Sequence, residues 1–117
     1  MAKLIKAVSI QPHRKPIIIN IENSLEKFQN HVHGYIESCF SWEDNAWMVG
    51  NDEAKLIGME PNVFVVDNRC NIIDIIAGPI LILGADDEGE TISLTDRQCE
   101  YYSRLLEKHL LIIGGAR

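Results

Sequence analysis

The polar stretch from Asn51 to Asn62 contains the residues best suited to bind a ligand. Besides its two terminal amides it carries a carboxylate at Glu53 and an ammonium group at Lys55. Amides donate and accept hydrogen bonds, as a nucleobase edge requires, and a lysine can meet a phosphate as a point charge. We therefore expect Asn51, Glu53 and Asn62 to contact base or ribose edges, and Lys55 to contact a phosphate. The alternative is that the asparagines only close turns by bonding to their own backbone.

Two further segments extend this expected site. Arg14 and Lys15 follow His13 in a short basic segment and would add positive charge for phosphate groups. Tyr35 lies two residues before Glu37 in a strand-like segment, so their side chains share one face. The tyrosine ring could stack on a base, or it could pack against a neighbouring subunit.

The sequence shows no pattern typical of a catalytic or metal site. No serine lies in a G-x-S-x-G turn of the kind that exposes a nucleophile. His31 and His33 do not match the paired ligand spacing of structural zinc, and the acidic segment 86–90 lacks the ligand pattern of an EF-hand. Four carboxylates could pair for acid or base work if the fold brought them together: Glu37, Asp52, Glu53 and Asp74. We expect no catalytic residue, no metal ligand and no cofactor.

Composition limits the classes of partner and the number of domains. With 117 residues and a hydrophobic content of 46%, the chain suits a single domain spanning residues 1–117. A formal net charge of −6 opposes binding to duplex nucleic acid, which needs clustered lysine and arginine, but it leaves a small anionic ligand open. The longest apolar run, residues 75–83, falls short of the roughly 20 residues of a membrane helix, so no membrane partner is expected. Three widely spaced cysteines and no signal peptide favour a reducing cytoplasm.

Hydrophobic patterning predicts the elements that hold these residues. Strands are expected at residues 3–10, 17–21, 35–40, 46–49, 63–66 and 72–83, the last of them interrupted at Gly78-Pro79. Helices are expected from a capping box at Asn23 to about Gly34, and from a second capping box at Thr95 to Ile113. This order predicts an α+β fold in which a mainly antiparallel curved sheet carries both helices packed on one face.

Several short signatures together resemble a known family. They are Gly34-Tyr35-Ile36-Glu37, the segments 51–62 and 74–84, and Leu94-Thr95-Asp96-Arg97-Gln98. In this order they resemble the domain of unknown function numbered three-eight-four-six, found in phages and mobile elements of bacteria, over residues 3–106. His33, Asp52 and Ala54 stand where the family pattern has Gly, Glu and Gly. The resemblance implies a protein made in the cytoplasm of a bacterial host, where such proteins block host defence.

These observations lead to a functional expectation with rivals. The chain is expected to be a non-enzymatic small-molecule binding protein, a homo-oligomer that sequesters a nucleotide-type immune signal. Extra apolar surface at residues 110–113 favours self-association. The alternative is an acidic protein that binds and inhibits a host protein, using exposed aromatic residues such as Trp42 and Trp47. A weak hydrolase of the same ligand is a third hypothesis.

Overall fold

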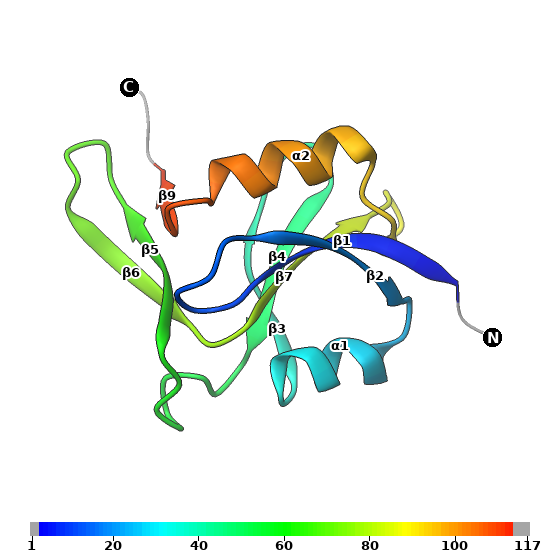
Figure 1. Cartoon of the computed structure of the whole chain (residues 1–117), viewed down its shortest axis with the longest axis horizontal. Coiled ribbons are helices and arrows are strands. Elements are labelled where there is room, and N and C mark those ends of the chain that lie inside the picture. The colour runs from blue at the N-terminus through cyan, green and yellow to red at the C-terminus, as the bar shows by residue number, and fades with distance from the viewer. Residues whose placement is uncertain (1–2, 114–117) are drawn as a thin grey trace.

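A six-stranded antiparallel sheet forms the centre of the fold (Figure 1). The structure is a computed structural model that describes residues 3–113. The strands of this central sheet are β1 (Leu4–Ile10), β2 (Ile17–Glu22), β3 (Ile36–Ser41), β4 (Ala46–Asn51), β7 (Ile80–Ala85) and β8 (Thr91–Ile92). Their order is β2-β1-β7-β4-β3, and β8 pairs with the end of β7. The strands expected at residues 3–10 and 17–21 form a hairpin, β1 with β2, and those expected at residues 35–40 and 46–49 form a second, β3 with β4.

A second, three-stranded sheet lies beside the central one and has the order β6-β5-β9. Its strands are β5 (Pro61–Val66), β6 (Ile72–Ala77) and β9 (Leu110–Ile112). The predicted interruption at Gly78-Pro79 is confirmed, and it is where the chain leaves β6 and enters β7 of the other sheet. Gly78 has a φ of +79°, which a residue with a side chain rarely adopts. The glycine therefore permits the change of sheet.

Within residues 3–113 the chain forms two helices, α1 (Leu25–Val32) and α2 (Asp96–Leu105), which lie on opposite faces of the central sheet (Figure 1). Phe28 of α1 joins the cluster that contains Ala7 and Leu81, whereas Tyr102 of α2 joins the cluster that contains Val8 and Ile82. The expected α+β class, the mainly antiparallel pairing and the two helices are confirmed, but their placement on one face was wrong. Because four successive residues of β7, from Ile80 to Leu83, are buried, both faces of this strand need a cover.

The last helix is shorter than the apolar spacing predicted. It ends at Leu105, and the residues expected to extend it form β9, which pairs in parallel with β5. His109 turns the chain with a φ of 59°, and Leu111 is only 3% exposed against the small sheet. Strand pairing and burial of Leu111 therefore outweigh the helical periodicity of the sequence. Within residues 3–113, no helix has the length and apolar character needed to cross a membrane.

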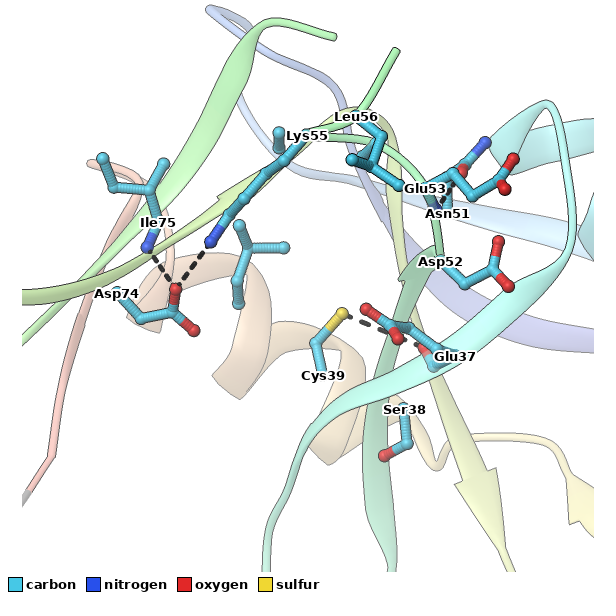
Figure 2. A pocket seen from close by; sticks show the side chains of 13 residues that line it. Glu37, Ser38, Cys39, Asn51, Asp52, Glu53, Lys55, Leu56, Asp74 and Ile75 are labelled. Carbon is cyan, nitrogen blue, oxygen red and sulfur yellow. Dashed lines mark hydrogen bonds and ion pairs between the residues drawn. The ribbon is translucent and has the colours of Figure 1, made fainter. Parts of the chain in front are cut away.

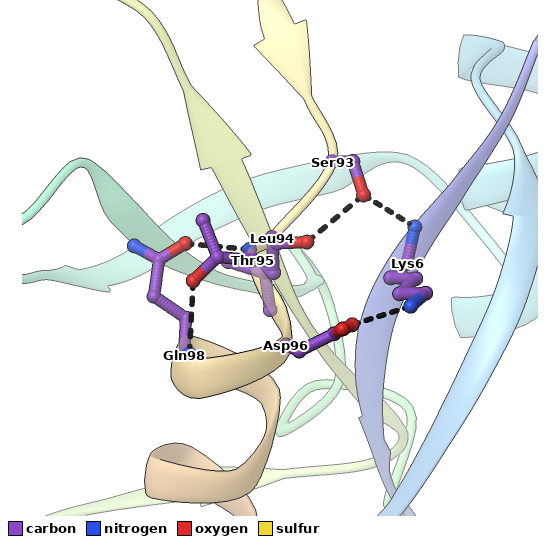
Figure 3. Close-up of polar contacts among 6 residues, drawn as sticks. All are labelled: Lys6, Ser93, Leu94, Thr95, Asp96 and Gln98. Atoms are coloured by element: carbon purple, nitrogen blue, oxygen red, sulfur yellow. Dashed lines mark hydrogen bonds and ion pairs between the residues drawn. The ribbon is translucent and has the colours of Figure 1, made fainter.

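Polar contacts at the start of α2 attach it to β1 (Figure 3). The backbone N–H of Gln98 donates to Thr95 Oγ1 at 3.0 Å, and Gln98 Oε1 accepts from the Thr95 N–H at 2.9 Å, which confirms the predicted capping box. Lys6 of β1 forms an ion pair with Asp96 in the first turn of the helix. These contacts fix both the first residue of α2 and its position over the sheet.

The first helix begins one residue later than predicted. Its N-cap is Ser24, whose Oγ accepts from the N–H of Lys27 at 3.2 Å. Asn23, the expected cap, instead donates to the carbonyl of Thr91 at 2.9 Å. The helix ends at Val32, before His33, which has a φ of 65°. Both ends of α1 therefore lie close to the predicted positions.

Candidate functional site

A crevice of about 350 Å³ lies between β3, at the edge of the central sheet, and β6 of the small sheet (Figure 2). One wall is residues 37–39 of β3, the other is residues 74–77 of β6, and the loop 51–56 closes one end. The loop is held by its own backbone, because the N–H of Ala54 donates to the carbonyl of Asn51 and the N–H of Ile57 donates to that of Glu53. The site is thus built from two sheets and the connection between β4 and β5.

Three of the predicted site residues line this crevice and four do not. Asn51, Glu53 and Lys55 belong to its wall. Tyr35 is 70% exposed and lines a neighbouring hollow, which shares Asn51 and Glu53 with the crevice. The remaining three lie elsewhere: Arg14 and Lys15 are exposed in the loop between β1 and β2, and Asn62 is buried. The structure therefore brings together only part of the predicted site.

The buried side chain of Asn62 connects distant elements by hydrogen bonds. It is 2% exposed, and its Nδ2 donates to the carbonyls of Ile10 at 2.8 Å and Gly78 at 2.7 Å. Its Oδ1 lies 2.8 Å from Nδ1 of His109. These bonds hold β1, the turn after β6 and the start of β9 against β5. The side chain bonds to backbone, as the alternative interpretation proposed, but to backbone far away in the sequence.

Asn51 has a comparable internal role at the end of α1. Its Nδ2 donates to the carbonyls of Val32 and His33, both at 3.1 Å, and its Oδ1 accepts from the N–H of Glu53 at 2.7 Å. The amide thus pairs carbonyls that the end of a helix leaves without partners. A Cβ at Gly34 would lie 2.5 Å from this Nδ2, so the close approach requires glycine. Gly34 and Asn51 therefore form one structural unit, although they belong to different short signatures in the sequence.

The charge of the crevice differs from what the sequence suggested. Lys55 Nζ lies 2.9 Å from Oδ1 of Asp74, and this contact holds the pKa of the Asp74 carboxyl below its usual range (Figure 2). Three more carboxylates line the same crevice, on Glu37, Asp52 and Glu53. A phosphate would meet a lysine already paired with a carboxylate, and it would meet three further negative charges. The lining therefore favours hydrogen-bond donors over anions.

Cys39 is a crevice residue that sequence reasoning did not select. The β3–β4 pairing shifts its register between Ser38 and Phe40, and Cys39 lies at this irregularity. Burial, with smaller contributions from the charges of Glu37 and Asp74, raises the pKa of its thiol to about 11. The thiol therefore stays protonated near neutral pH and is a poor nucleophile. No sequence signal marks the bulge, because the shift depends on pairing with β4.

Comparison with known proteins gives a family without an assigned activity. Residues 5–107 match the model of a family described as a domain of unknown function (DUF3846). No curated protein and no solved structure matches the chain. The matched range includes every residue that lines the crevice. Among residues 3–113, no group of three His, Cys, Asp or Glu side chains is arranged to hold a metal ion.

Proposed function

The chain belongs to the DUF3846 family, and we propose that it is a non-enzymatic small-molecule binding protein whose site is the crevice between β3 and β6. One observation carries the proposal: residues from both sheets and from the loop 51–56 enclose about 350 Å³. This volume is within the range of small-molecule sites, which is roughly 300 to 1,000 Å³. The side chains in the middle of the loop, Glu53 and Lys55, are exposed at the crevice and available to a ligand.

The pKa shifts of two crevice residues, Asp74 and Cys39, favour binding without catalysis. A general acid or base works best with a pKa near the working pH. The pKa of Asp74 lies below its ordinary value, because Lys55 bonds to the carboxylate, and that of Cys39 is raised to about 11. Both shifts move the group away from neutrality. Asp74 thus stays an ionised acceptor and Cys39 a neutral thiol, which suits retention of a ligand.

The charge of the lining changes the ligand that the sequence led us to expect. Among the described residues that line the crevice, four carboxylates accept hydrogen bonds and repel phosphate groups, and Lys55 is already paired with Asp74. A ligand rich in hydroxyl or amino groups, such as a nucleoside, fits this lining better than a nucleotide does. Sequestration of a host signal in the bacterial cytoplasm remains the role that family resemblance favours, with the ligand now expected to present donors.

The test is a matched titration of the full chain. Nucleosides, their 5′-phosphates, simple sugars and amines are each measured by isothermal titration calorimetry and native mass spectrometry. We expect a donor-rich neutral or cationic compound to bind, and its phosphorylated form to bind more weakly. The double variant Asp52→Asn and Glu53→Gln removes two negative charges from the loop. It should weaken binding of the donor-rich compound and strengthen binding of its phosphorylated form.

The matched control is Asp87→Asn, which removes one charge from an exposed turn outside the crevice. It should leave both affinities unchanged. If no compound of the panel is retained at millimolar concentration, the crevice is not a small-molecule site. If the 5′-phosphates bind more tightly than the nucleosides, the argument from charge is wrong.

The second candidate function is inhibition of a host protein, and it is favoured by the outer edge of the central sheet. β2 is an edge strand, and its Ile17 and Ile18 are 56% and 52% exposed on opposite faces. An edge of this kind can pair with a strand of another protein or of a second copy. Sedimentation of the purified chain distinguishes pairing with a second copy from pairing with another protein, because only self-association occurs when no other protein is present. Ile18→Lys should abolish either complex, and an unchanged complex would exclude this edge.

A further inference from the structure

A hollow of about 370 Å³, apart from the crevice and from the hollow beside Tyr35, lies between α2 and the turn that joins β3 to β4. Three aromatic rings contribute to its wall, those of Trp42, Tyr101 and Tyr102, and Arg97 also lines it. The ring centroids of Trp42 and Tyr102 are 4.5 Å apart, and those of Tyr101 and Tyr102 are 4.9 Å apart at an interplanar angle of 81°. None of these residues belongs to the crevice, so this hollow is a separate feature.

The helix and the turn are locked together at this place. Tyr102 is 1% exposed, and its hydroxyl donates to Oδ1 of Asp44 at 2.6 Å. The Gln98 amide donates to the carbonyl of Asp44 at 2.9 Å, and Gln98 is itself held by the capping box with Thr95. Burial, and then the hydrogen bond to Asp44, raise the pKa of Tyr102, which therefore remains a donor. A ligand entering the hollow meets walls that need little further ordering.

The open side of the hollow presents an aromatic face and a cation. Tyr101 is 55% exposed, and it follows Arg97 by four residues, so both project from the same side of α2. Among residues 3–113, Arg97 has no ion-pair partner. The Asp44 carboxylate is already bonded to Tyr102 and Gln98. Asp44 and the exposed Glu43 at the rim both carry negative charge, so an anionic group is held only where it contacts the guanidinium of Arg97 directly, away from these two carboxylates.

We propose that this hollow binds a planar aromatic ligand carrying an anionic or acceptor group. The ring lies against Tyr101 and Trp42, and the acceptor pairs with the guanidinium of Arg97, whose planar fork suits a carboxylate or phosphate. Such a ligand is either a nucleotide or a simple aromatic acid, and the two share the same recognition chemistry. The inference is independent of the crevice, because no residue is common to the two sites.

The test uses the fluorescence of Trp42. The chain has two tryptophans, so Trp47→Phe leaves Trp42 as the only indole, which can be excited selectively over the tyrosines. Four probes are titrated: adenosine 5′-monophosphate, adenosine, benzoate and cyclohexanecarboxylate. We expect saturable quenching by at least one aromatic probe that carries an anionic group, and none by cyclohexanecarboxylate, which has the charge of benzoate without the ring. The indole N–H signals of the wild-type chain in nuclear magnetic resonance spectra give the same readout if Trp47→Phe does not fold.

Variants then assign the contacts. Tyr101→Ala should weaken the aromatic probe about tenfold, the scale of one lost stacking partner. Arg97→Gln should weaken the anionic probe and leave adenosine unchanged. Tyr35→Ala, which removes a more exposed tyrosine outside the hollow, should have no effect. The proposal is overturned if no aromatic probe gives saturable quenching, if cyclohexanecarboxylate binds as well as benzoate, or if Tyr101→Ala binds like the wild type.

Discussion

The two ends of the 51–62 connection differ from its middle in what their polar side chains do. Asn51 and Asn62, at the ends, are 6% and 2% exposed, and their side chains form hydrogen bonds with backbone groups inside the protein. Glu53 and Lys55, in the middle, are exposed and line the crevice. Burying an amide costs little free energy when backbone groups replace its hydrogen bonds to water, whereas burying an unpaired charge costs much more. Polar residues close in sequence therefore divide into structural and accessible ones according to burial.

The largest effect is expected from Asn62→Ala. The substitution leaves the buried carbonyls of Ile10 and Gly78 without their donor, and we expect the free energy of unfolding to fall by about 3 kcal/mol. Urea denaturation followed by circular dichroism measures this loss. Asn68→Ala, at an exposed turn position, is the control and should be near neutral. A stable Asn62→Ala variant with lost ligand affinity would show that the end of the connection belongs to the site after all.

The next effect concerns the reactivity of Cys39, opposite the loop. Because its pKa is about 11 instead of 9.0, its thiolate fraction at pH 8 is about a hundredfold below that of an ordinary thiol. Iodoacetamide labelling, followed by mass spectrometry, should modify the exposed Cys70 first. The rate at Cys39 should then rise about tenfold for each pH unit up to about 11. Equal labelling of Cys39 and Cys70 at pH 8 would mean that the crevice does not suppress ionisation.

A smaller effect is expected from acid, through His31 on α1. Its Nε2 lies 2.8 Å from Oγ of Ser9, and burial, followed by the charge of His33, lowers its pKa from 6.5. The unfolded chain therefore binds this proton more readily than the folded chain does. The stabilisation is complete above pH 6.5 and is lost as the pH falls below it, towards the folded pKa. This loss would loosen α1, whose end Asn51 caps.

Chemical denaturation at a series of pH values between 7.5 and 5 measures this effect. His31→Gln cannot take up a proton, so its stability should fall less over this range than that of the wild type. If His31→Gln and the wild type show the same slope, His31 does not contribute to the acid sensitivity of the protein.

The smallest effect is expected from Lys55→Met, in the middle of the connection. Its ion pair with Asp74 joins side chains that are 65% and 57% exposed, and pairs of this kind contribute little to stability. We expect the free energy of unfolding to change by less than about 0.5 kcal/mol. Lys108→Met, outside the crevice, is the matched control. A loss as large as that of Asn62→Ala would contradict the division between the ends and the middle of the connection.

The candidate site was only partly predictable, because its members depend on long-range contacts. Asn51, Glu53 and Lys55 are neighbours in sequence, and they stayed together in the crevice wall. Cys39 and Asp74 come from two different sheets, and their meeting depends on how β3 and β6 lie relative to each other. The hollow beside α2 joins two short segments, residues 42–44 and 97–102, and no spacing rule in the sequence connects one segment with the other.

The sequence by itself determined the local features of the fold. Both hairpins, the capping box at Thr95 and the break at Gly78-Pro79 follow from residues a few positions apart, since turn and cap geometry depends on nearby backbone and side chains. Tertiary structure alone decided that the helices cover opposite faces and that residues 110–112 form a strand. It also decided which polar groups are buried, because partners for a buried amide or an apolar face come from distant parts of the chain.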